Sequence, residues 1–172
     1  MLCKALIPLA DPNTGSPHDP DVGTNPRAVE LQLEHRFTDL ALLVRALTHA
    51  SYAAEHPSAE AQDPLAFVGD AALGLVVAEH LLHAEPAASV GRLTPRRAAL
   101  VADEALARWA VALDLGSLLR LGRGAERTGG RMTASILATT LEAVLGALYL
   151  DGGLPAVRRA VARLAGWDSR AS

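Results

Sequence analysis

The sequence lacks several features that would assign it to a particular class of protein. Its single cysteine, Cys3, excludes an intrachain disulfide framework and a cysteine-based zinc cluster, which fits a reducing cytoplasm. Its six histidines have no metal-ligand spacing, and its formal charge of −3 is not that of a generally basic nucleic-acid binder. We expect no membrane-spanning segment, because no apolar run is long and charge-free enough. We expect no signal peptide either, because the start lacks the succession of basic, apolar and small residues that a signal peptide has.

The chain does contain enough apolar material for one domain with a core. Of its 172 residues, 50% are hydrophobic. Residues 1–26 hold five prolines among small and polar residues, so we predict a disordered tail there. The predicted domain covers residues 27–167, and residues 168–172 form a short C-terminal tail. No strand pattern occurs, so the domain is predicted to be all-α.

A nearly uninterrupted apolar stretch over residues 65–82 contains one acid, Asp70. This pattern is typical of a helix that is buried all round. A carboxylate inside such a helix is costly unless it is paired, hydrogen-bonded or bound to a metal. The alternative is that Asp70 caps a helix that starts after Gly69.

A second apolar helical stretch, residues 135–150, also carries one acid, Glu142. Two such helices can pack so that both carboxylates face one small polar site, whose hard oxygen ligands suit Mg²⁺, with Mn²⁺ as a substitute. The alternative is that both acids form salt bridges with arginines.

The remaining segments are predicted from caps and periodicity. Residues 27–48 indicate a helix pair, with Thr38 or Asp39 as the cap of its second helix. Polar groups at residues 49–52 are interpreted as satisfying backbone groups at a helix end. Residues 91–113 predict one long amphipathic helix, residues 122–131 a flexible glycine-rich loop, and residues 151–153 a turn before a last helix.

Residues 65–70 read Leu-Ala-Phe-Val-Gly-Asp and resemble the signature helix of the ribonuclease III family, usually Leu-Glu-Phe-Leu-Gly-Asp before an alanine-rich turn. Further segments match that family in the same order and extend the resemblance over residues 31–165. They are residues 46–52, 91–94, 97–101, 119–122, 128–130, 135–137 and 142–153. The resemblance implies an all-α, ribonuclease III endonuclease-domain-like helical bundle.

The resemblance also implies four carboxylates around one or two Mg²⁺ ions, two on each of the two apolar helices. Asp70 and Glu142 match this set and are the predicted catalytic and metal-binding residues, whereas Ala66 and Thr139 stand where the family has the other two acids. Thr139 and Asp63 are candidates for an assisting role. The short Mini-III branch of the family is similar, because its signature has the same alanine and threonine, and it is regarded as active on ribosomal RNA precursors.

Two functions are consistent with this reduced set of acids. In the first, the chain is a divalent-metal-dependent endoribonuclease for double-stranded or structured RNA, with water and RNA phosphate oxygens completing the Mg²⁺ shell. In the second, it is a catalytically degenerate scaffold that binds structured RNA or a ribosomal protein. The family resemblance favours the enzyme, since one acid is present on each helix.

The resemblance further implies a two-fold homodimer, because Phe67 resembles the family residue that inserts into the partner subunit. The alternative is that Phe67 is an ordinary core residue. Because the chain ends at Ser172, we expect no separate double-stranded-RNA-binding domain, so RNA contacts should come from two arginine clusters. These are Arg92, Arg96 and Arg97, and Arg123, Arg127 and Arg131. A solvated helix face is the alternative for the first cluster.

Overall fold

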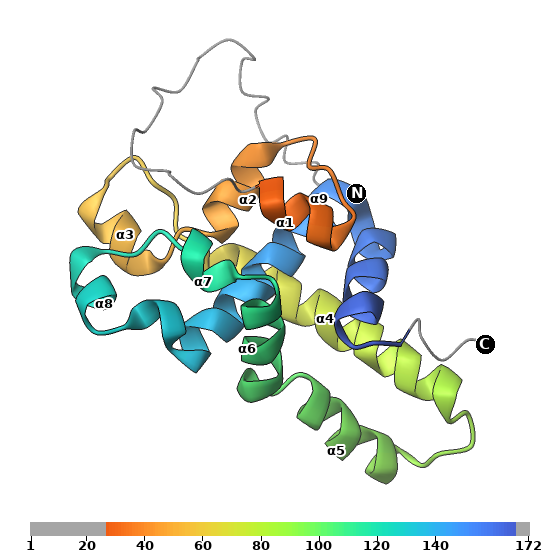
Figure 1. Cartoon of the computed structure of the whole chain (residues 1–172). Helices are drawn as coiled ribbons and strands as arrows, with labels where there is room; N and C mark the ends of the chain where they lie inside the picture. Colours follow the sequence, from red (N-terminus) through yellow and green to blue (C-terminus); the bar gives the residue numbers. More distant parts are fainter. Residues whose placement is uncertain (1–26, 168–172) are drawn as a thin grey trace, which may run out of the picture.

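A computed structural model describes residues 27–167, which form α-helices joined by short connections (Figure 1). Within this range there is no β-strand, only an isolated bridge between Thr48 and Arg120. The prediction of an all-α fold is confirmed. The predicted tails lie outside the described residues and stay predictions. The elements are α1 (Arg27–Leu33), α2 (Leu40–Ala46), α3 (Ala50–Glu55), α4 (Asp63–Ala84), α5 (Val90–Leu100), α6 (Asp103–Ala112), α7 (Leu115–Leu118), α8 (Arg123–Arg127), the 3₁₀ turn η1 (Gly130–Met132) and α9 (Ala134–Leu164).

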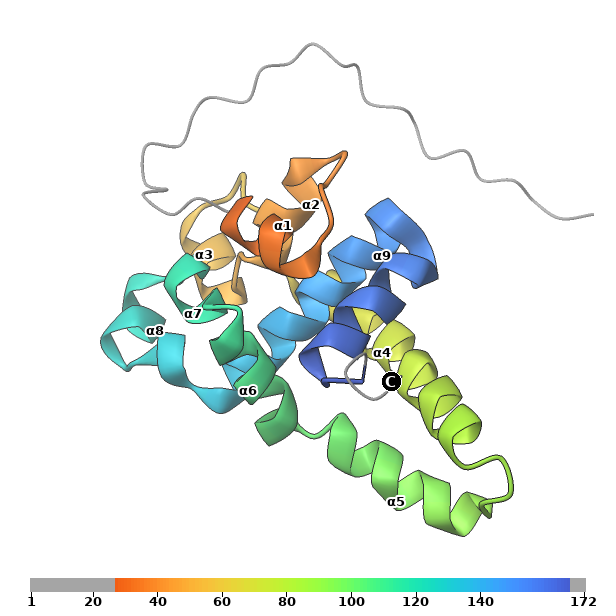
Figure 2. The same cartoon turned by 45° about the vertical axis from the view of Figure 1, so that its right-hand side comes forward.

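The two longest helices, α4 and α9, pack against each other at the centre of the molecule, with α6 along α9 and α2 over it (Figures 1 and 2). By length and apolar composition alone both helices qualify as candidate membrane spans, although each carries acidic residues, as expected from the sequence. Their apolar faces form the core instead, and this accounts for their composition. The expectation that α4 is buried all round was wrong, because one face of it is exposed.

Two glycines allow α4 and α9 to cross with their backbones in direct contact. A Cβ atom built on Gly69 would overlap the carbonyl oxygen of Glu142 and lie 2.8 Å from the backbone nitrogen of Gly146. A Cβ atom on Gly146 would likewise overlap the carbonyl oxygen of Leu65. Only glycine permits so close an approach. The crossing therefore fixes the side chains next to these glycines relative to one another.

The N-terminal helix pair is tied to α9 by Asp151. Its carboxylate accepts hydrogen bonds from the backbone nitrogens of Thr38 (3.0 Å) and Asp39 (3.1 Å) and lies 2.6 Å from Nε2 of His35. Asp39 itself caps α2 by accepting from the nitrogen of Ala41 at 2.9 Å, as one of the two predicted caps. The hydrogen bonds from His35, Asp39 and Thr38 lower the pKa of Asp151, although burial opposes this.

The predicted turn at residues 151–153 is present as a sharp change of direction in α9. Gly153 has φ 67° and ψ −177°, so two helical segments meet there, and Pro155 begins the second one. Val157 and Val161 face the core, and the arginines of this segment are exposed, as predicted.

The prediction of one helix over residues 91–113 was wrong, because the chain breaks at residues 101–102. Ala102 is extended, with ψ 148°, and α6 starts at Asp103 with a second acid, Glu104, in its first turn. Acidic residues at this position stabilise a helix N-terminus, so the sequence carried a signal for the break. The preceding helix, α5, contains no buried residue and projects from the body of the molecule (Figure 2).

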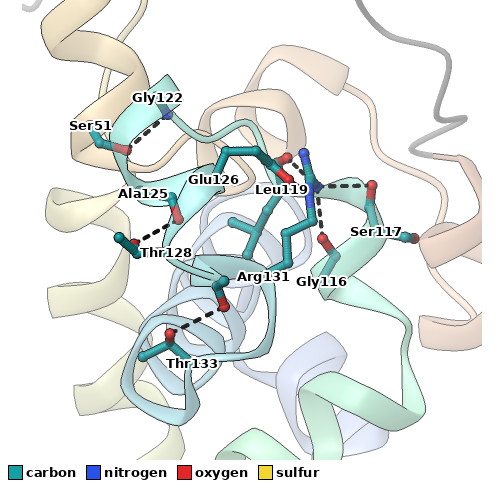
Figure 3. Close-up of polar contacts among 11 residues, drawn as sticks. Ser51, Gly116, Ser117, Leu119, Gly122, Ala125, Glu126, Thr128, Arg131 and Thr133 are labelled. Atoms are coloured by element: carbon teal, nitrogen blue, oxygen red, sulfur yellow. Dashed lines mark hydrogen bonds and ion pairs between the residues drawn. The ribbon is translucent and has the colours of Figure 1, made fainter.

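Residues 122–131 are not a flexible loop, because α8 and η1 occupy this segment. The guanidinium of Arg131 donates to the carbonyl oxygens of Gly116 (2.9 Å) and Leu119 (2.8 Å) and to Glu126 (2.7 Å), as Figure 3 shows. Gly122 donates its backbone N–H to Ser51 Oγ at 2.9 Å. Charge-assisted bonds to backbone carbonyls order this segment.

The polar residues after α2 satisfy backbone groups, as predicted. His49 Nδ1 accepts from the nitrogen of Ser51 at 3.2 Å and so caps α3. Tyr52 is buried, and its hydroxyl accepts a hydrogen bond from Arg120 at 2.9 Å. These contacts join α3 to the connection that follows α7.

Candidate active site

Asp70 and Glu142 lie beside the crossing of α4 and α9. Asp70 follows Gly69, and Glu142 lies four residues before Gly146, so the contact between the two glycines brings the two acids to one place. Asp70 is in the interior of α4, so the alternative that it caps a helix beginning after Gly69 was wrong. Its side chain is exposed rather than buried, whereas Glu142 is half-buried.

The electrostatics of Glu142 reflect this crowding of negative charge. Burial, the charge of Asp70 and the charge of Asp103 together raise the pKa of Glu142 to about 7. Neither Asp70 nor Glu142 is paired with an arginine within residues 27–167, so the alternative of two salt-bridged helix acids is wrong for the described residues. The site therefore concentrates negative charge that no side chain of the described domain neutralises.

Asp103, in the first turn of α6, is the residue of this group that sequence reasoning missed. Because residues 91–113 read as one helix, its position at a helix start next to α9 was not anticipated. Asp63, the candidate assisting acid, is the first residue of α4. Seven residues separate it from Asp70, which corresponds to a rise of about 10 Å along the helix. The charges that raise the pKa of Glu142 are those of Asp70 and Asp103.

The positions where the resemblance expects two further acids hold no carboxylate. Ala66 is buried, with 6% of its surface exposed, and Thr139 is half-buried. Within residues 27–167 no three His, Cys, Asp or Glu side chains are gathered closely enough to enclose a metal ion. Two neighbouring carboxylates nevertheless suit Mg²⁺, which commonly binds through one or two carboxylates, several waters and substrate phosphates. The donor set thus fits a cation shared with a substrate and does not fit an all-protein cage.

The arginines singled out in the sequence differ in what they contact. Arg92 and Arg96 form ion pairs with Glu85, at 3.0 Å for Arg92, whereas Arg97 is exposed without an ion-pair partner in the described domain. In the second cluster Arg123 lies 3.6 Å from Glu55, and Arg131 is held by backbone carbonyls. Arg127 is exposed. The elements that carry the two clusters, α5 for the first and α8 with η1 for the second, lie on different sides of the molecule in both views (Figures 1 and 2).

Phe67 is not a core residue, because 80% of its surface is exposed. One turn and two turns further along α4, Ala71 and Leu75 are also exposed, and Leu82 extends the same helix with an exposed apolar side chain. The alternative that Phe67 belongs to the core was therefore wrong. An exposed apolar stripe of this kind marks a surface for association.

Comparisons with known proteins agree with this architecture. The family model described as Ribonuclease-III-like matches residues 39–165. Ribonuclease 3 of Streptomyces coelicolor is 55% identical over 124 residues, which are 72% of this chain and 45% of that protein. Ribonuclease 3 of Symbiobacterium thermophilum is 49% identical over 131 residues, 76% of this chain and 55% of that protein.

The same relationship holds in three dimensions. The nuclease domain of ribonuclease III from Campylobacter jejuni superposes with a TM-score of 0.77 at 36% identity, covering 81% of this chain and 95% of that domain. The chain spans about half the length of the Ribonuclease 3 proteins that it matches. Because the family model covers most of the chain and the nuclease domain is matched almost completely, the chain belongs to the ribonuclease-III-like family.

Proposed function

We propose that the chain is an endoribonuclease that cuts double-stranded or structured RNA, with Asp70 and Glu142 as its catalytic carboxylates. The observation that supports this most strongly is the crossing of α4 and α9, which holds the two acids together without a cationic partner in the described domain. Similarity to proteins named Ribonuclease 3 supports the reaction class. Processing of ribosomal RNA precursors in the cytoplasm is the role that we propose for it.

Asp70 and Glu142 would hold Mg²⁺, or Mn²⁺ in its place, which when bound supplies an activated water and stabilises charge on the phosphate. The exposed position of Asp70 leaves that carboxylate accessible from solvent, and half-buried Glu142 anchors the other side of the site. Thr139, one turn before Glu142 on α9, would orient a water through its hydroxyl. Ala66 contributes no ligand.

The decisive experiment is cleavage of long double-stranded RNA with Mg²⁺ or Mn²⁺ by the wild-type chain and by Asp70→Asn and Glu142→Gln. We expect metal-dependent cleavage that both variants lose. Glu104→Gln, an exposed acid in the first turn of α6, is the matched control and should cut like the wild type. Absence of cleavage by the wild type, also on structured ribosomal RNA precursors, would refute the proposal.

A second candidate function is a scaffold that binds structured RNA, or a ribosomal protein, without cutting. The observation in its favour is that Ala66 and Thr139 carry no carboxylate and that no three acidic or histidine side chains of the described domain are gathered closely enough to hold a metal ion. The cleavage experiment separates the two functions. If RNA binds as tightly to the wild type as to Asp70→Asn and Glu142→Gln and no chain cuts, the scaffold is correct.

We also propose that two chains form a homodimer through the exposed apolar stripe of α4 that begins at Phe67. A solved nuclease domain from Campylobacter jejuni is described as having a region involved in dimer formation, and the projecting helix α5 offers additional surface next to α4. Phe67→Ala should convert a dimer into a monomer in sedimentation at micromolar concentration. Leu31→Ala, which removes an exposed apolar side chain from α1, should not. A wild-type monomer would exclude the dimer.

For RNA contact we propose Arg97 and Arg127 as the principal cations, since both are exposed and unpaired in the described domain. Arg92, Arg96 and Arg123 would bind a phosphate only after breaking their ion pairs with Glu85 or Glu55. Charge reversal of Arg97 or Arg127 should weaken binding similarly for all sequences and reduce its salt dependence. Arg159→Glu, on the exposed face of the last helical segment, is the control.

A further inference from the structure

We infer that the exposed imidazole of His56 is a stacking platform for an unpaired base of the bound RNA. This inference rests on the proposed function, and it specifies the structured RNA that the chain prefers as a duplex with an unpaired base. The platform lies where α3 ends, beside α8. Figure 1 shows α3 and α8 next to each other at one edge of the molecule, away from the crossing of α4 and α9.

The ring of His56 is held in a defined orientation. It stacks on the ring of Tyr52, with 3.8 Å between the ring centres and an angle of 11° between the ring planes. Its Nδ1 lies 2.9 Å from the carbonyl oxygen of Tyr52, and because a carbonyl only accepts, Nδ1 carries the proton of the neutral ring. The imidazole therefore has little freedom left to lose when a ligand binds to it.

Tyr52, which supports the imidazole, is fixed from its other side by Arg120. Tyr52 is buried, its hydroxyl accepts a hydrogen bond from Arg120 at 2.9 Å, and the guanidinium carbon of Arg120 lies 4.3 Å from the ring centre. One ring face has room for one planar group at such a distance, so His56 and Arg120 lie on opposite faces of Tyr52. Because His56 is exposed and Tyr52 covers one of its faces, the other face of the imidazole is open to solvent.

This open face adjoins the second arginine cluster. Glu55, the residue before His56, accepts a hydrogen bond from the backbone nitrogen of Arg123 at 2.9 Å. The side chain of Arg123 is 91% exposed, and Arg127 is exposed one turn later on α8. Proteins bind unpaired nucleotides with this combination, in which an aromatic face stacks on the base and cations contact the backbone. In a fully paired duplex the bases are stacked on one another, so such an RNA engages only the cations.

The test compares three RNA duplexes of the same sequence by fluorescence anisotropy, in EDTA to prevent metal-dependent cleavage. One is fully paired, one carries a single bulged adenosine, and one carries a bulged abasic nucleotide, which has the same backbone but no base. Because recognition by shape tolerates any sequence, the chain can bind in the register that brings the bulge to His56. We expect the adenosine bulge to bind about tenfold more tightly than the abasic bulge, as is usual for stacking of a base on an aromatic side chain.

Three variants separate the platform from a purely structural role, in which His56 only donates its N–H to the last turn of α3. His56→Tyr keeps a flat ring without that donor and should retain the preference for the adenosine bulge. His56→Asn keeps a donor without a ring and should bind both bulges equally. His83→Asn, the same change at an exposed histidine in the last turn of α4, is the matched control and should retain the preference. Circular dichroism verifies each fold, and the wild type with His56→Tyr decides the question if His56→Asn does not fold.

The outcomes distinguish the inference from the proposed function. If the wild type binds both bulges equally, if His56→Asn retains the preference, or if His56→Tyr loses it, the inference is overturned. Metal-dependent cleavage of the fully paired duplex would still support the enzyme in each of these cases. If the wild type binds none of the three duplexes and cuts no RNA, the inference and the proposed function both fail. A preference that depends on a flat ring at position 56 confirms the inference.

Discussion

Replacing Gly69 by alanine tests whether the backbone contact between α4 and α9 sets the geometry of the domain. The added Cβ would overlap the carbonyl oxygen of Glu142, and a real Cβ essentially never lies within 3.0 Å of such an atom. The helices must therefore separate by roughly 1 Å, which is enough to lose a quarter to a half of the dispersion energy across the contact. Alanine gains about 1 kcal/mol in helix propensity, so we expect a net loss of about 2–4 kcal/mol in the free energy of unfolding.

Urea unfolding followed by circular dichroism measures this loss. Gly146→Ala should behave similarly, because its Cβ would overlap the carbonyl oxygen of Leu65. Gly124→Ala is the matched control, since nothing lies within 4 Å of an added Cβ in α8, and it should stabilise by up to about 1 kcal/mol. If Gly69→Ala stabilises the chain as Gly124→Ala does, the two helices do not touch through their backbones and the reasoning is refuted.

Three further predictions concern charged groups. In EDTA, Glu142→Gln should raise the melting temperature at pH 8 but not at pH 4, because the raised pKa means that stability falls as pH rises from 4.5 to about 7. Asp151→Ala should cost about 3 kcal/mol at pH 7, against about 1 for the cap variant Asp39→Ala. Because the pKa of Asp151 is lowered, the stability that its carboxylate provides is lost as pH falls below 3.8. The difference in stability loss between the two variants should therefore shrink in thermal unfolding at low pH. Arg131→Lys should destabilise by about 2 kcal/mol in urea, since lysine lacks the fork that reaches several carbonyls, whereas Arg127→Lys should not.

The pairing of Asp70 with Glu142 was predictable because each acid stands alone in a long apolar stretch. A carboxylate in such a helix is stable only where it meets a polar partner, and the charge of Asp70 is one of the causes that raise the pKa of Glu142. The burial of each acid was not predictable, since composition does not tell which face of α4 the other helices leave open. Asp70 and Phe67 both lie on exposed positions of this helix.

The predictions for residues 91–113 and 122–131 were wrong for the same reason, because both relied on local sequence patterns alone. Residues 91–113 contain no proline or glycine at the break, so apolar periodicity continued across Ala102 although Asp103 and Glu104 indicated a helix start. Residues 122–131 looked flexible because they contain four glycines. The bonds that order this segment come from carbonyls of Gly116 and Leu119, which no local pattern identifies.

The electrostatics of the site distinguish the two candidate functions. Glutamine at position 142 would give a higher free energy of unfolding than ionised glutamate, because burial and the charges of Asp70 and Asp103 disfavour the ionised acid. A scaffold that binds RNA phosphates would be hindered at this place by the same negative charges. A cation between the acids and a phosphate removes both penalties at once, since it neutralises the pair and attracts the RNA. A divalent ion bound with a phosphodiester at the α4–α9 crossing would therefore offset the cost of the two unpaired acids. This argument favours the nuclease over the scaffold.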